Sequence, residues 1–157
     1  MKIEEKAIEA YRKASASEKE LLESIFGKTL LRGDVMDRIQ SFNDVLVENG
    51  ITSGQLYNQI EGLPKDEQTY IKLKLVVAAY NEGWKPNWRD KSEDKYELWV
   101  SYKDFLNDAG QVAVTSNYTP SYAYASFGSR LVFKKREHAI RAGELFIDLW
   151  RYWFIEE

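Results

Sequence analysis

The sequence predicts an α+β fold, in which N-terminal helices precede a small antiparallel sheet of three or four strands over about residues 95–134, and a long C-terminal helix packs on the sheet. Two changes in the spacing of apolar residues predict it. Apolar residues recur every three or four positions up to about residue 83, and they alternate with polar residues along the middle of the chain. After residue 136 they return to the helical spacing. With 157 residues, the chain is long enough to bury a core without disulfides.

The first elements are expected to be helices. Apolar residues spaced three and four apart give residues 3–14 one apolar face. Ser17 and Glu20 match a capping box that would start a second helix, which Gly27 would end. The next six residues, 28–33, are expected to form a short extended segment.

Three further helices are expected before the spacing of apolar residues changes near residue 83. Ser41 and Ser53 are suitable residues to start two short ones. Pro64, followed by two acidic residues, is typical of a first helical turn, and Gly83 is a natural stop for the long helix that begins there.

Alternation of apolar and polar side chains then predicts the strands, and a broad apolar face predicts the last helix. The expected strands cover 96–105, 111–118, 121–127 and 130–134, and the final helix covers about 136–155. We expect a helical N-terminal region over 1–62 and an α+β core over 63–157, with one continuous domain as the alternative.

Residue content argues against catalysis. The chain has no cysteine and one histidine, His138, which we expect to be neutral and at the surface or half-buried. No glycine-rich phosphate loop is present, and the acids Asp90, Glu93 and Asp94 alternate with lysines, as is typical of a solvated loop. We therefore predict a protein that is not an enzyme, with no catalytic residue, metal or cofactor. A hydrolase built on scattered carboxylates is the less favoured alternative.

Charge and hydropathy bear on location and partners. The net charge is −3 with interspersed signs, which disfavours nucleic acid as the main partner. The charged N-terminus does not resemble a secretory signal, and the longest apolar run, Leu75–Tyr80, is too short to cross a bilayer. We expect no membrane insertion and a location in the cytoplasm of the cell that makes the protein.

Aromatic residues are the unusual feature of the sequence. Eleven of the 22 fall within residues 80–127, and an alternating strand can turn only about half of its side chains to one core. The rest would be available for binding, unless they complete the core of a small sheet. We expect Trp88 to be more exposed than Trp84. The predicted partner-binding residues are Trp84, Trp88, Tyr118, Tyr122 and Tyr124.

Three segments together resemble a known family. They are AAYNEGWKPNW (78–88), KYELW (95–99) and GSRLVFKKREHAIRAGELFIDLW (128–150). In order and spacing they are similar to small uncharacterised proteins of gut Bacteroidales, their prophages and related phages, and the resemblance covers roughly residues 64–155. It implies a phage or mobile-element setting. The family brings no established activity, so no catalytic residue can be carried over.

These observations predict a non-enzymatic binding or accessory protein of phage or prophage origin. Its partner would be a phage or host protein, met in the host cytoplasm or within an assembled virion. Single-stranded nucleic-acid binding is the alternative, with the same rings stacking on bases and basic residues near the phosphates. Those basic residues would be Lys134, Lys135, Arg136 and Arg141.

Overall fold

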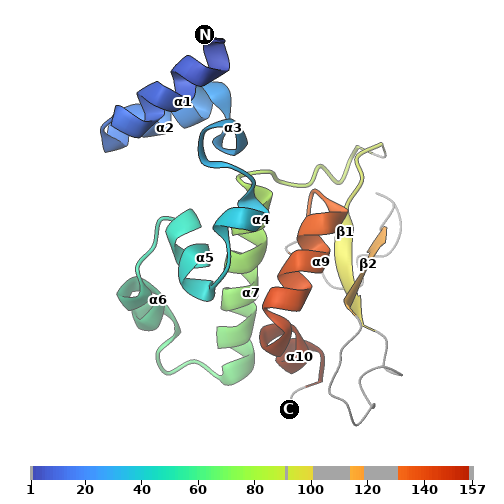
Figure 1. Cartoon of the computed structure of the whole chain (residues 1–157). Coiled ribbons are helices and arrows are strands. Elements are labelled where there is room, and N and C mark those ends of the chain that lie inside the picture. Colours follow the sequence, from blue (N-terminus) through green and yellow to red (C-terminus); the bar gives the residue numbers. More distant parts are fainter. Residues whose placement is uncertain (1, 91, 101–113, 119–130, 156–157) are drawn as a thin grey trace. The chain divides into compact units, whose positions relative to one another are not determined.

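The computed structural model describes residues 2–90, 92–100, 114–118 and 131–155. This part of the chain is predominantly helical and divides into two compact units, Met1–Gln40 and Ser41–Glu157 (Figure 1). The sequence placed a boundary near residue 62, whereas the contacts within the structure group residues 41–62 with the C-terminal unit.

The first unit begins with a pair of helices. Ser15 and Glu18 cap the second of them, and the Glu18 carboxylate accepts a hydrogen bond of 2.7 Å from the backbone N–H of Ser15. The capping box therefore lies two residues before the predicted Ser17 and Glu20, which have the same spacing. The helices of this unit are α1 (Ile3–Lys13), α2 (Ala16–Phe26), α3 (Lys28–Arg32) and α4 (Val35–Arg38).

The extended segment expected over 28–33 is wrong, because Lys28–Arg32 forms α3. Glycines bound this short helix on both sides. Gly27 and Gly33 have φ angles of 79° and 84°, a left-handed conformation that glycine adopts without a steric penalty. The two leucines between them therefore lie on one helical turn instead of a strand.

The second unit contains the longer helices. Ser41 caps the first of them as predicted, since its side chain accepts a hydrogen bond from the backbone N–H of Asp44. Thr52 caps the next one, and Pro64 immediately precedes the longest. The helices of this unit are α5 (Phe42–Glu48), α6 (Ser53–Ile60), α7 (Lys65–Asn81), α9 (Arg136–Leu145) and α10 (Ile147–Ile155).

Helix α7 lies in the middle of this unit (Figure 1). Helices α5 and α6 pack on one side of it, where Leu46, Leu56 and Ile60 form a buried cluster. Helices α9 and α10 also pack against α7, and α9 in turn contacts the strands. The helix accordingly has buried residues in every turn after its first: Thr69, Leu73, Val76, Val77, Ala79, Tyr80 and Asn81.

The predicted α+β class with a sheet of three or four strands is wrong. In the described part of the chain, strands are limited to β1 (Tyr96–Val100) and β2 (Val114–Tyr118), which pair antiparallel with Tyr96 opposite Tyr118. The expected strand over 130–134 makes only an isolated bridge, between Phe133 and Tyr96. The chain leaves the strand direction soon after this bridge, because α9 begins at Arg136. The expected strand over 121–127 lies outside the described residues.

The single C-terminal helix expected over 136–155 is also wrong. Phe146 has non-helical angles, with φ −115° and ψ 35°, and it separates α9 from α10. The two halves differ in their neighbours: α9 packs on β1 and β2, as predicted for the whole helix, and also contacts α7, while α10 packs on α7. In that second contact, the rings of Tyr70 and Trp153 stack with centroids 5.1 Å apart.

Trp150 tests how much α10 contributes to stability. Its side chain is buried, and its ring lies 6.5 Å from that of Phe133. We expect Trp150→Ala to lower the free energy of unfolding by roughly 3–5 kcal/mol, as large core truncations do. Urea unfolding followed by circular dichroism measures the change.

The control is Tyr57→Ala, which truncates a ring that is 58% exposed on α6 and should cost less than about 1 kcal/mol. Equal, small effects of the two substitutions would show that α10 is an appendage and not part of the core.

Candidate functional site

The segment after α7 turns back along the helix that it leaves. Glu82 and Gly83 both have positive φ angles, 48° and 89°, which end the helix and reverse the chain. The backbone N–H of Trp84 then donates to the carbonyl oxygen of Asn81, 2.8 Å away. Trp84, Pro86 and Trp88 are thereby placed beside the last turns of α7.

Asn81 fastens the end of α7 to the segment before α9. Its side-chain N–H donates to the carbonyl oxygen of Val132 at 2.8 Å, and its side-chain oxygen accepts from the backbone N–H of Lys134 at 2.9 Å. Asn81 is buried, so these bonds satisfy polar groups that water does not reach.

The Glu93 carboxylate holds the aromatic segment in place. It accepts hydrogen bonds from the indole N–H of Trp84 at 3.1 Å and from the backbone N–H of Asn87 at 2.7 Å. It also forms an ion pair of 3.1 Å with Lys95. One side chain thus connects both ends of the turn that carries the two indoles.

Lys95 completes this network from inside the protein, since its side chain is 0% exposed. Its ammonium group donates to the carbonyl oxygens of Glu93 and Asp90, and it lies 5.5 Å from the centre of the Trp88 ring. A buried ammonium requires such partners, because desolvation of an unpaired charge is costly. The expectation that the acids and lysines of residues 90–95 form a solvated loop is wrong for Lys95.

Sequence reasoning missed Glu93 and Lys95, because alternating charges are typical of exposed loops. A usable indication was present in the aromatic residues. Two indoles within five residues bring two N–H donors that need acceptors once they are partly buried. The nearest following glutamate, Glu93, is a suitable acceptor.

The pKa of Glu93 reflects these contacts. Partial burial raises it, whereas the hydrogen bonds from the Asn87 backbone, Lys95 and Trp84, together with the Lys95 charge, lower it by more. The net result is a pKa below the ordinary value for glutamate, so the ionised form holds the segment at neutral pH.

Around the two indoles lies a groove of about 420 Å³, which we call the aromatic groove. Both indoles are partly buried, so Trp84 is not a fully buried core residue and Trp88 is not fully exposed. The lining residues come from α7, the segment after it and the segment before α9: Lys74, Val77, Ala78, Asn81, Gly83, Trp84, Lys85, Pro86, Trp88 and Val132.

Of the five predicted partner-binding residues, the structure brings together Trp84 and Trp88. Tyr118 lies at the end of β2, opposite Tyr96. Tyr122 and Tyr124 lie outside the described residues.

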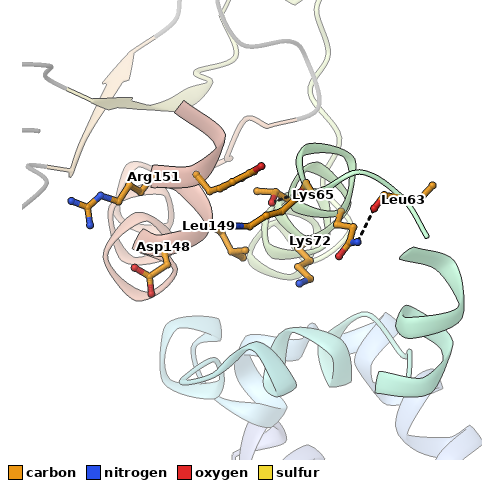
Figure 2. A pocket seen from close by; sticks show the side chains of 9 residues that line it. Leu63, Lys65, Lys72, Asp148, Leu149 and Arg151 are labelled. Carbon is orange, nitrogen blue, oxygen red and sulfur yellow. Dashed lines mark hydrogen bonds between the residues drawn. The ribbon is translucent and has the colours of Figure 1, made fainter. Parts of the chain in front are cut away.

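A second groove, of about 740 Å³, lies between the first turns of α7 and helix α10 (Figure 2). We call it the basic groove, because three of its lining residues are cationic and one is acidic. Its lining residues are Leu63, Lys65, Gln68, Thr69, Lys72, Asp148, Leu149, Arg151 and Tyr152.

His138 lies away from both grooves. It is buried on α9, contrary to the expectation of a surface or half-buried side chain, and its ring centre lies 5.8 Å from that of Tyr80. Burial raises the pKa of Tyr80 to about 12, although the Arg141 guanidinium opposes the shift. Tyr80 is therefore un-ionised at neutral pH.

The basic residues predicted to contact nucleic acid differ in exposure: Lys134, Lys135 and Arg136 are exposed, and Arg141 is partly buried.

Comparison with known proteins gave no assignment: no protein-family model, curated protein or solved structure matches the chain. Within the described ranges, histidine and acidic side chains form no group of three or more that could hold a metal ion. None of the described helices is both long enough and apolar enough to span a membrane.

Glu93→Gln tests the network through pH. Since the folded-state pKa of Glu93 is lowered, its ionised form contributes stability above its unfolded pKa, near 4.5, and this contribution is lost as the pH falls through the folded value. We expect Glu93→Gln to be less stable than the wild-type protein at pH 6. The difference between the two urea midpoints should shrink steadily below about pH 4.5.

Glu20→Gln is the control, because Glu20 is an exposed carboxylate on α2 in the other unit. It should show no comparable pH-dependent difference from the wild-type protein. A Glu93→Gln difference that stays constant from pH 6 to pH 3 would contradict a role for the ionised carboxylate.

Proposed function

We propose that the protein is a non-enzymatic binding protein that holds a segment of a partner protein in the aromatic groove. The observation that supports this most strongly is the state of Trp84 and Trp88. Both indoles are only partly buried, yet the loop that carries them is held in place by hydrogen bonds to Glu93, which in turn forms an ion pair with Lys95. Aromatic side chains that are fixed and still accessible are typical of the residues that dominate protein interfaces.

Fixing the loop favours binding. A mobile loop loses conformational entropy when it closes on a partner, whereas this one is already ordered by hydrogen bonds and by Pro86. The groove volume of about 420 Å³ lies within the range of small-ligand pockets, so it suits a few side chains of an extended segment.

The lining indicates the chemistry of that segment. Val77, Val132 and the two indoles offer apolar surface, and both polar ends of the Asn81 amide are already occupied. The ionisable residues of the lining are Lys74 and Lys85, and no acid is among the residues that line the groove. We therefore propose an extended segment with apolar side chains, proline included, that carries carboxylates at its ends.

The biological setting is proposed from the sequence resemblance alone. It favours an accessory protein of a phage or prophage, which would act on a phage or host protein in the host cytoplasm or within a virion. The aromatic groove is compatible with either partner.

Synthetic peptides test the proposal. The probe is a peptide of roughly ten residues with leucine and proline at its centre and glutamates at its ends, and its partner peptide has lysines in place of the glutamates. We expect the acidic peptide to bind more tightly, and Trp88→Ala to weaken its binding roughly tenfold or more, as loss of an anchoring ring does. Calorimetric titration measures both affinities.

Two further variants make the test specific. Tyr57→Ala removes an exposed ring outside the groove and should leave binding unchanged. Joint replacement of Lys74 and Lys85 by glutamine should abolish the preference for the acidic peptide. Equal binding of both peptides by all variants, or no binding at all, would contradict the proposal.

Single-stranded nucleic acid is a second candidate, favoured by one observation. Val132 lines the aromatic groove, and the exposed Lys134 follows two residues later, so three lysines lie on or near the groove. For this candidate, a thymidine oligonucleotide should bind with an affinity that falls steeply with salt, and Lys134→Gln should reduce the slope.

A further inference from the structure

The basic groove contains charges that the protein itself does not neutralise. In the part of the chain that the structure describes, no ion pair joins Lys65, Lys72 or Arg151 to a carboxylate, although Asp148 lines the same groove. The Lys65 ammonium lies 4.2 Å from the centre of the Tyr152 ring, which orients the charge without cancelling it.

Arg151 supplies a second indication. Its Nε is buried and has no hydrogen-bond partner within the described residues. A buried donor without an acceptor is unfavourable, and this Nε is itself closed to a ligand. Arg151 as a whole is only partly buried, so the end of its guanidinium is the part that would meet an anion. Guanidinium and ammonium groups together are typical of sites that bind phosphate.

The arrangement of the charges limits the ligand. Figure 2 shows Lys65 and Lys72 on α7, and Arg151 on α10 with its guanidinium directed away from α7. The three charges therefore do not converge on one point, and a groove of about 740 Å³ is much larger than one phosphate requires. Charges spread in this way suit a ligand whose negative groups are also spread along its length.

We propose that the basic groove binds a ligand with two or more linked phosphate groups. Lys72 and Lys65 would neutralise one end of the phosphate chain and Arg151 the other, while Asp148 would oppose binding. A nucleoside triphosphate and inorganic polyphosphate share this chemistry. The proposal does not depend on the aromatic groove, which lies at the opposite end of α7.

Calorimetric titrations with inorganic tripolyphosphate, ATP and orthophosphate, without magnesium and at low salt, test this site. We expect tripolyphosphate to bind at least tenfold more tightly than orthophosphate. Equal affinities for tripolyphosphate and ATP would identify the phosphate chain as the whole ligand. Tighter binding of ATP, still dependent on Lys72, would identify a nucleotide.

Four variants assign the binding to this groove. Lys72→Gln should weaken tripolyphosphate binding several-fold, and a second replacement, Lys65→Gln, should weaken it further. Asp148→Asn should strengthen it, which general destabilisation of the fold cannot do. Lys135→Gln removes an exposed charge before α9, outside the groove, and should change nothing.

Circular dichroism melting confirms that each variant is folded, and Lys72→Gln is the safest of them because Lys72 makes no hydrogen bond or ion pair in the described structure. The proposal is overturned if tripolyphosphate does not bind, if Lys135→Gln weakens binding as much as Lys72→Gln, or if Asp148→Asn has no effect. Tight binding of a thymidine oligonucleotide that depends on Lys135 and not on Lys72 also overturns it.

Discussion

The C-terminal unit depends on the need to bury α7 on more than one side. An amphipathic helix can lie on a surface with one face in water, whereas α7 packs on two sides. Most of its buried residues, from Thr69 to Tyr80, form one stripe, and Ile71 and Leu75 on another side pack against the cluster of Leu46, Leu56 and Ile60. Layers on several sides are therefore required, and α5, α6, α9 and α10 supply them. The break at Phe146 separates α9, which contacts both strands and α7, from α10, which packs on α7.

Both grooves also take their positions from α7. One lies where the helix ends and the chain turns back, and the other lies where the helix begins beside α10. A rigid helix of 17 residues separates them, and each has its own chemistry: indoles and apolar side chains at one end, cations at the other. Sites that are built on a packed helix keep their geometry better than sites on free loops.

Features that depend on residues close in sequence could be predicted, whereas contacts between residues far apart in the sequence could not. Pro64, Ser41 and Gly83 mark helix ends because capping depends on residues close in sequence. The strand expected at 130–134 is limited to one bridge at Phe133, and the side chain of the distant Asn81 forms hydrogen bonds with Val132 and Lys134 on either side of it. Likewise Trp84 and Trp88 were found by composition, whereas the buried state of Lys95 depends on packing that no local pattern expresses.

The bonds of Asn81 also have a consequence for the order of folding. They join residues 51 and 53 positions apart, and thereby close a chain segment that includes both strands. Closing so long a loop carries a substantial entropic cost, and it is possible only after residue 134 has left the ribosome. The helical pairs formed by α5, α6 and α7 involve shorter separations and can form during synthesis. The end of α7, and with it the aromatic groove, is therefore among the last parts of this unit to be completed.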